Sequence, residues 1–376
     1  MDLEARCEPV LETARTYAAD VDAAARFPTE AVEALRASGL LGLTLPTEVC
    51  GLGAGPVEFS QVTARLAAAC GSTAMIYLMH VSAAMTAAAA PPPSLPQVLT
   101  AMASGRTLAT LAFSESGSRS HFWAPASRAT LDGDGQVRLA AEKSFVTSAG
   151  QADLYVVCTL SADAGTGDGA VDLYAVAADT PGVAVAGAWR GMGLRGNASA
   201  PMRIEVSLSE GHRIGKPGAG FELMTGTVMP WFNLGNAAVS LGLATAACDA
   251  AISHASTARL QHLGQTLAEL PTVRARIARM ALRRAVTESY VRTASASIAA
   301  PDEQTALHVL GVKALANDAA LEVTDEAMRI CGGAAFSAHL QVERIFRDAR
   351  AGHVMAPTAD VLYDFYGKAV TGQPLF

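Results

Sequence analysis

Small polar residues gather in a stretch that could bind a flat ring or a phosphate group. Serine and glycine follow an apolar run in Leu111–Ser120. Because small residues let the backbone come close to a ligand, a strand end of this kind can present N–H groups and hydroxyls to it. Phe113, Ser114 and Ser120 are the candidates here. The alternative interpretation is a polar loop at the end of a strand.

A second stretch, Lys143–Ser148, combines an aromatic residue with hydroxyl groups. Phe145 offers an aromatic face, and Thr147 offers a hydroxyl two residues later. An aromatic face and a hydroxyl suit a flat ring that carries heteroatoms along its edge. The alternative is a core phenylalanine and a strand threonine, both of which are common in sheets.

A pair of glycines forms the third candidate. Gly332 and Gly333 follow a long helical stretch that ends at Cys331, and the charged segment Glu343–Arg350 comes soon after. Paired glycines can cap a helix and permit a close backbone approach to a ligand. The alternative is an ordinary helix terminator.

The elements that would position these stretches follow the order helices, strands, helices. Apolar periodicity and stop signals predict helices first, then short strands from about Thr107, then helices again from about Phe221. The predicted early helices are Glu4–Ala24, Thr29–Ser38, Val57–Ala69 and Ser72–Ala90, and the clearest strands are Leu154–Cys158, Val171–Val176 and Met202–Leu208. We therefore expect three domains, at residues 1–106, 107–215 and 216–376.

Composition excludes several classes of protein. Of 376 residues, 51% are hydrophobic and 17% charged, which excludes a disordered chain and implies large buried cores. A net charge of -7 without a basic cluster argues against a nucleic-acid partner. The charge-free stretches Leu66–Gly105 and Leu223–Cys248 are long enough to span a membrane. They are rich in alanine and interrupted by polar residues and proline, so we expect buried bundle helices and no membrane partner.

The cysteines and the N-terminus bear on metal binding and localisation. None of the six cysteines belongs to a CxxC pair, so the sequence predicts neither a zinc ribbon nor a dithiol motif, and we expect no metal. Scattered thiols fit a reducing compartment. Because the acidic N-terminus has no apolar core typical of an export signal, we expect a cytoplasmic protein.

In order and spacing, these stretches resemble the acyl-CoA dehydrogenase family along nearly the whole chain. The resemblance implies an α+β multidomain fold with an N-terminal helical domain, a central small β-barrel and a C-terminal four-helix bundle. It also implies FAD bound between the last two domains and a neighbouring subunit, and hence a homodimer or homotetramer.

The resemblance also assigns roles to the candidate residues. Ser114 would contact the flavin ring beside Phe113, and Ser120 the pyrophosphate. Phe145 takes the place of a tryptophan that lies against the flavin in the family, and Thr147 that of a threonine bonded to the ring.

Other candidates would act across a subunit interface. Cys331, Gly332 and Gly333 would meet the pyrophosphate of the neighbouring subunit's FAD. The family's Arg-x-x-Phe-Gly loop, which contacts FAD across the dimer, has its counterpart at Arg259–Gly264, one residue longer.

The chain departs from the family at the catalytic base. Most members use a Glu shortly after the segment that matches Arg347–Arg350, and an ungapped alignment places Ala356 there. A minority use a Glu at a position that falls near Phe232, where this chain has no carboxylate either. We expect a displaced base, with Asp360 and His353 as candidates. The alternatives are a helix-capping role for Asp360 and a loop position for His353.

Three functions remain open. The first, our prediction, is oxidation of an acyl thioester of CoA or of an acyl carrier protein, with α-proton removal and β-hydride transfer to FAD. A flavoprotein electron acceptor is a possible partner. The second is a flavin-dependent monooxygenase that uses His353, His80 or His121 for proton handling. The third is a non-catalytic flavin or acyl binder.

Overall fold

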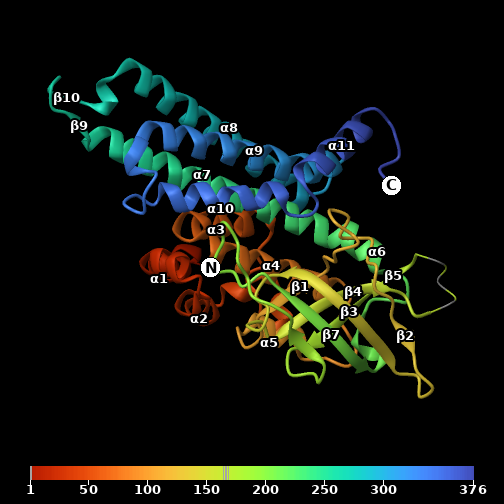
Figure 1. Ribbon diagram of the computed structural model, residues 1–376. Coiled ribbons are helices and arrows are strands. Elements are labelled where there is room, and N and C mark those ends of the chain that lie inside the picture. The colour runs from red at the N-terminus through yellow and green to blue at the C-terminus, as the bar shows by residue number, and fades with distance from the viewer. Residues whose placement is uncertain (1, 164, 166, 168) are drawn as a thin grey trace.

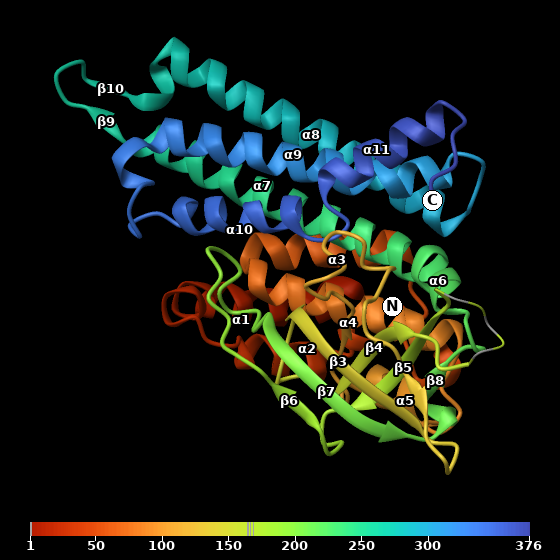
Figure 2. The same cartoon turned by 45° about the vertical axis from the view of Figure 1, so that its right-hand side comes forward.

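The computed structural model describes residues 2–163, 165, 167 and 169–376, and their elements form three parts. N-terminal helices, red to orange in Figure 1, lie beside a β-domain drawn in yellow and green. A long helical bundle, teal to blue, lies across both (Figures 1 and 2). The three parts confirm the predicted fold class.

The described residues of the N-terminal part form five α-helices, with the longest connection, residues 39–55, between the second and the third. They are α1 (Leu3–Ala24), α2 (Thr29–Ser38), α3 (Pro56–Ala69), α4 (Gly71–Ala89) and α5 (Val98–Ala103). The Asp2 carboxylate accepts the Ala5 N–H at the start of α1, and Gly39 ends α2 with φ +77°. The predicted helices therefore agree with the observed ones to within a residue or two.

The described residues of the β-domain form two four-stranded sheets. One has the strand order β1 (Ala109–Ala112), β4 (Leu154–Leu160), β5 (Val171–Ala177), β8 (Arg213–Ile214), with β1 and β4 parallel. The other has the order β2 (Thr130–Leu131), β3 (Val137–Val146), β7 (Ala200–Leu208), β6 (Val183–Val185).

Burial patterns show how the sheets pack. Strands β3 and β7 alternate between buried and exposed residues, because one face meets the other sheet and one meets solvent. Strand β4 is buried on both faces. Tyr155 and Val157 pack between the sheets, whereas Val156 and Cys158 join the core shared with the N-terminal helices.

The C-terminal part is a bundle of long helices. It is formed by α7 (Met229–Thr257), α8 (Pro271–Ala299), α9 (Thr305–Cys331) and α10 (Val342–Val354), with α6 (Gly220–Leu223) leading into α7 and α11 (Ala359–Val370) after α10. The hairpin of β9 (Arg259–Leu260) and β10 (Gln265–Thr266) joins α7 to α8.

One helical run in the described residues, Gly220–Thr257, is long and apolar enough to cross a membrane. However, 78% of its most apolar window is buried inside the protein. Its apolar side chains face other helices, as the core helix of a bundle requires.

Two adjacent residues of α10 connect the three parts. The Arg347 guanidinium binds both oxygens of Asp22 on α1 and donates to the Met192 carbonyl of the β-domain at 3.0 Å. The neighbouring Asp348 carboxylate accepts the Leu194 N–H at 2.6 Å. Between these loop residues, a Cβ on Gly193 would lie 2.4 Å from the Arg347 carbonyl oxygen, so only glycine permits this approach. We call this contact the Arg347–Asp348 joint.

The Arg347–Asp348 joint predicts a pH effect on stability. Burial raises the pKa of Asp348 to about 7, although the Leu194 N–H favours the charged form. The unfolded pKa is near 3.9, so the folded state binds more protons between about pH 4 and 7. The contribution of this group to stability therefore falls as pH rises through that range.

We expect Asp348→Asn to raise the free energy of unfolding at pH 8, because it keeps an oxygen acceptor for Leu194 but removes the buried charge. The gain is on the order of a few kcal/mol at pH 8, falls to about 1–2 kcal/mol at pH 5 and vanishes below about pH 4. Denaturant unfolding of wild type and variant at these pH values measures it. Asp348→Ala, which lacks the acceptor, serves as the control and should be less stable than Asp348→Asn throughout. A difference between Asp348→Asn and wild type that does not change with pH would contradict this account.

Candidate active site

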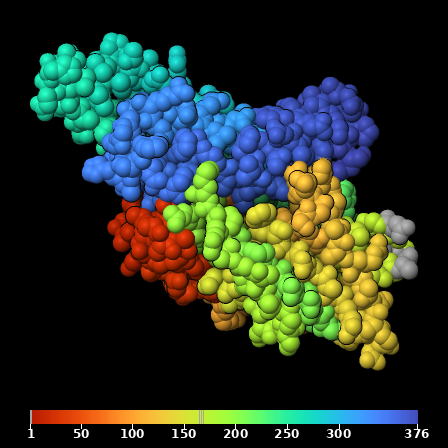
Figure 3. Space-filling view, viewed as in Figure 1, coloured from red at the N-terminus to blue at the C-terminus, as the bar shows by residue number. Residues whose placement is uncertain are grey.

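A cavity of about 1080 Å³ lies where the β-domain meets the bundle. Figure 3 shows two projections of the β-domain, one orange and one yellow-green, that reach the blue helices of the bundle. Met79 of α4 and Phe232 of α7 contribute apolar surface to the cavity. The other lining residues fall mainly in four segments, 111–122, 144–147, 189–199 and 347–358.

The stretch after β1 forms one wall. Phe113, Ser114 and Ser120, the candidates of the first predicted stretch, all line the cavity. The Ser114 carbonyl accepts the Ser144 N–H at 2.8 Å, so the two predicted stretches are bonded to each other. The Phe113 ring stacks on Phe122 with centroids 6.1 Å apart.

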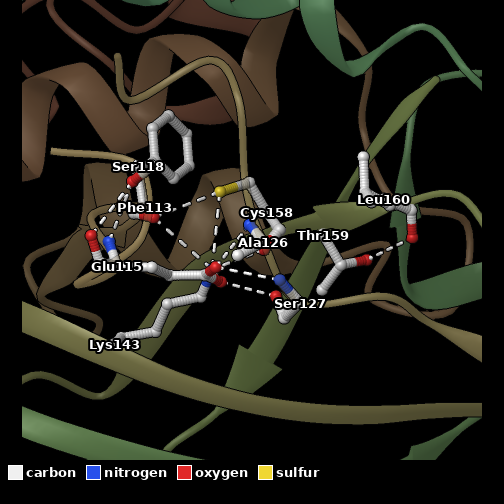
Figure 4. Close-up of polar contacts among 9 residues, drawn as sticks. All are labelled: Phe113, Glu115, Ser118, Ala126, Ser127, Lys143, Cys158, Thr159 and Leu160. Carbon is white, nitrogen blue, oxygen red and sulfur yellow. Dashed lines mark hydrogen bonds and ion pairs between the residues drawn. The ribbon is translucent and has the colours of Figure 1, made fainter. Parts of the chain in front are cut away.

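A buried ion pair supports this wall from behind (Figure 4). Lys143 Nζ lies 2.5 Å from Glu115 Oε1 and 2.6 Å from the Cys158 carbonyl oxygen. The other Glu115 oxygen accepts the N–H groups of Ala126 and Ser127. Burial by itself would raise the pKa of Glu115, but the Lys143 charge and these hydrogen bonds hold it below its usual value.

A β-bulge turns Phe145 outward. The register of β3 against β7 shifts between Lys143 and Val146, and Phe145 adopts φ +54°, which is rare for a bulky residue. Its side chain is 70% exposed, lines the cavity and meets Trp189 edge-on at 6.5 Å. The bulge therefore presents a free aromatic face to the cavity.

Polar atoms surround this aromatic face. The Thr147 hydroxyl lies 3.1 Å from the Ser199 hydroxyl, and both residues line the cavity. Asn197 also lines it, and its buried side-chain oxygen has no hydrogen-bond partner. An unpaired buried polar atom is costly unless a ligand or a water satisfies it.

The end of α10 forms the opposite wall. Its lining residues are mostly apolar: Ala351, Val354, Met355 and Ala356, with Arg350 beside them. The Arg350 guanidinium lies over the Phe346 ring and donates to Thr324 Oγ1 at 2.8 Å. Burial lowers the pKa of Arg350 from its usual value.

The cavity offers no free carboxylate among its described lining residues. Glu115 is the one acidic residue among them, and Lys143, Ala126 and Ser127 occupy its oxygens. Ala356, at the position where the resemblance expects a Glu, lines the cavity and is half-buried.

The two predicted bases lie outside the lining. Asp360 is exposed in the first turn of α11. His353 points to α9, with Nδ1 3.4 Å from Asp318 Oδ1, and Tyr363 donates to the other oxygen of that carboxylate at 2.5 Å. A catalytic role for His353 or Asp360 therefore stays a prediction.

The residues predicted to act across an interface lie far from this cavity. Arg259 is exposed on the β9–β10 hairpin, and Gly332 and Gly333 are exposed where α9 ends. Cys331, just before them, is buried. Both segments occupy the end of the bundle that is on the left in Figures 1 and 2.

The histidines proposed for the monooxygenase alternative differ in environment. His80 is fully buried, with Nε2 2.9 Å from the Leu41 carbonyl oxygen, and its Nδ1 accepts the Ala109 N–H at 3.0 Å. Burial lowers the pKa of His80 to about 4. Both ring nitrogens are thus occupied by the backbone, so His80 is structural. His121 is exposed beside Trp123.

Sequence reasoning missed several residues of this site. Glu115 and Lys143 lie inside the predicted stretches, but their pairing depends on strands far apart in the chain. A charged residue in an alternating strand, facing the core as Lys143 does, is the signal that could have revealed the pair. Asn197 and Arg350 gave no comparable signal.

Comparison with known proteins places the chain in a family. Three family models match: the acyl-CoA dehydrogenase N-terminal domain at residues 7–106, the middle domain at 110–206 and the C-terminal domain at 218–371. Together they span most of the chain. This protein therefore belongs to the acyl-CoA dehydrogenase family.

Individual relatives agree with this assignment. The chain is 29% identical over 350 residues to the probable acyl-CoA dehydrogenase FadE25 of Mycobacterium tuberculosis, covering 92% of this chain and 88% of the relative. Among solved structures, butyryl-CoA dehydrogenase from Megasphaera elsdenii superposes with a TM-score of 0.90 at 22% identity, over 99% of this chain and 98% of the other. FMN-bound TdsC from Paenibacillus sp. A11-2 gives a TM-score of 0.87 at 24% identity, over 98% and 97%. The two structures share the fold.

The buried pair yields a stability prediction. Lys143→Met leaves the Glu115 carboxylate buried without its counter-ion, so we expect a loss of about 3–5 kcal/mol in the free energy of unfolding. Urea unfolding measures it. Arg203→Met, which removes a surface cation beside Glu142 and Glu205, should cost less than about 1 kcal/mol. Equal losses for the two variants would mean that the buried pair contributes no more than a surface pair.

Proposed function

We propose that this protein is an FAD-dependent oxidoreductase that oxidises an acyl thioester in the cavity between the β-domain and the bundle. One observation carries the proposal: a free aromatic face and several hydroxyls on one side of the cavity oppose an apolar wall on the other. When bound, a flavin would accept the β-hydrogen of the substrate as hydride. A base would accept the α-proton.

The residues on the β-domain side fit a flavin. Phe145 offers an exposed ring, and the unpaired Asn197 oxygen can accept an N–H from a heterocycle edge. Ser114 and Thr147 would bond the ring system, and Ser120 the phosphate. Because TdsC, which shares the fold, binds FMN, the choice between FAD and FMN needs a measurement. Mass spectrometry of the flavin released from the purified protein distinguishes the two.

The α10 side fits an acyl chain. Val354 and Met355 offer apolar surface, and Met79 and Phe232 extend it from α4 and α7. Burial of methylene groups against such surface contributes about 0.8 kcal/mol for each CH₂. These residues would bind and orient the chain and exclude water from it.

The base is the part of the proposal that departs from most of the family. Glu115 is held by Lys143 and cannot accept a proton without losing that pair. We therefore propose that Asp360 or His353 takes the α-proton after a local movement of the α10–α11 turn. A positioned base contributes about 10²–10⁴-fold to such a step.

Anaerobic mixing of the flavin-loaded protein with a panel of acyl-CoA and acyl-carrier thioesters tests the proposal. Bleaching of the flavin absorbance by one of them is the expected result, and it also identifies the carrier. Firmly bound flavin that no thioester bleaches would contradict it. Failure to bind flavin at all would instead favour the non-catalytic alternative.

Substitution at Ala356 tests the base. We expect Ala356→Glu to raise the rate of flavin reduction by at least tenfold, because it puts a carboxylate on the cavity wall. Ala351→Glu, five residues earlier on the same wall, is the control and should give no gain. Under the displaced-base proposal Asp360→Asn slows the same reaction. Full activity of Asp360→Asn would eliminate Asp360 and leave His353.

The lack of a free carboxylate among the described lining residues favours a second candidate, a flavin-dependent monooxygenase. His353 or the exposed His121 would then handle a substrate proton. Its test is product analysis with a flavin reductase and O₂ over a broad substrate panel. Absence of any oxygenated product would count against it.

Assembly and partners complete the proposal. We propose a homodimer or homotetramer, in which Arg259 and the Cys331–Gly333 segment of one subunit would reach the flavin of another. We also propose that a flavoprotein accepts the electrons and that the protein is cytoplasmic. Size-exclusion chromatography with light scattering tests the assembly, and a monomer with bound flavin would contradict it.

A further inference from the structure

Lys313 of α9 is a buried cation whose partners are all backbone carbonyls. The side chain is fully buried. Its Nζ lies 2.9 Å from the Gly352 oxygen, 3.1 Å from the Met355 oxygen and 2.8 Å from the Pro357 oxygen. An ammonium group has three donors, and three acceptors use all of them.

No carboxylate forms an ion pair with this ammonium group in the part of the chain that the structure describes. Asp318, further along α9, instead accepts the Tyr363 hydroxyl and lies 3.4 Å from His353 Nδ1. Compensation for the buried charge comes from the carbonyls at the C-terminal end of α10, where the helix dipole is negative. Lys313 thus caps α10 from another helix.

These carbonyls belong to the same short segment as the residues that line the cavity. Lys313 binds positions 352, 355 and 357, and the cavity wall includes Ala351, Val354, Met355 and Ala356. The ammonium group therefore lies directly behind the wall. Fixing its carbonyls fixes the backbone that presents the side chains to the cavity.

A second polar contact reinforces this arrangement. The Asn317 amide, one turn after Lys313, donates to the same Gly352 oxygen at 2.7 Å, and its own oxygen accepts the Ser240 hydroxyl at 2.8 Å. A Cβ at Gly352 would lie 2.7 Å from that Asn317 oxygen, so glycine allows α9 and α10 to approach here. Helices α7, α9 and α10 meet at this point through polar groups rather than apolar packing.

We propose that Lys313 is a positioning residue, whose buried ammonium group holds the α10 end of the cavity wall in the geometry that substrate binding requires. The role of Lys313 in substrate binding rests on the proposed function. Its role in holding the cavity wall rests only on its three contacts with backbone carbonyls.

Hydrogen exchange followed by mass spectrometry tests the wall directly. Lys313→Met keeps an unbranched side chain of similar length but has no donor, so the carbonyls at 355 and 357 lose their partner. We expect amide exchange in peptides covering 350–358 to rise at least tenfold, with α8 unchanged. Lys368→Met, on α11, removes a lysine that pairs with Asp364 and lies over the Phe365 ring, and it should leave exchange in 350–358 as in wild type.

Two further measurements keep the proposal testable. Lys313→Gln supplies two N–H donors, so its exchange should lie between wild type and Lys313→Met, and equal exchange in the two variants would overturn a role for the donors. In the unmodified protein, amides 351–355 should exchange as slowly as the middle of α9. Fast exchange there, or unchanged exchange in Lys313→Met, would also overturn the proposal.

Kinetics then connect the wall to substrate. With a thioester that the wild type oxidises, Lys313→Met should raise KM at least tenfold at an unchanged flavin content, with a smaller effect on kcat. An unchanged KM would overturn the positioning role. If the wild type oxidises no thioester, the proposed function fails, but the exchange experiment still decides whether Lys313 holds the wall.

Discussion

The contact of Arg347 and Asp348 with the rest of the protein is the constraint on which the cavity depends. Neighbouring residues on α10 point to different parts: Arg347 binds α1 through Asp22, and Asp348 accepts the Leu194 N–H of the β-domain. The two bonds fix the position of α10 against both parts at once. Since the following turns of the same helix form a cavity wall, the shape of the cavity follows from this contact.

Buried charges fix the other boundaries of the cavity in a similar way. Lys143 and Glu115 hold the strand ends of the β-domain from behind, and Lys313 holds the end of α10. In each case the charged group donates hydrogen bonds to backbone carbonyls, which apolar packing alone does not do. Apolar contacts hold the three parts of the fold together, and these polar contacts fix their relative positions.

Much of the fold could be predicted from the sequence because its signals are local. Helix periodicity, stop residues and strand alternation depend on neighbouring positions, and Thr29–Ser38 begins and ends where its signals indicate. The β-domain wall was also predictable, since Ser114, Phe145 and Thr147 belong to short stretches of distinctive composition.

The remaining part of the site depends on tertiary contacts. An ungapped alignment identifies Ala356 as the vacant base position, but it does not show that Asp360, four residues later, is exposed. Lys313 carried an unused signal, because it is the one charged residue between Glu303 and Asp318. What it binds lies about forty positions further along the chain, beyond the reach of local patterns.

The pair of Asp22 and Arg347 also has a consequence for how the protein is made. The two residues are 325 positions apart. At about 5–20 residues per second, a ribosome needs on the order of 15–65 s to reach Arg347 after Asp22 has been added. During that time α1 has no partner on α10, so the first helices must remain compact and soluble on their own. The cavity is therefore among the last features to form during synthesis.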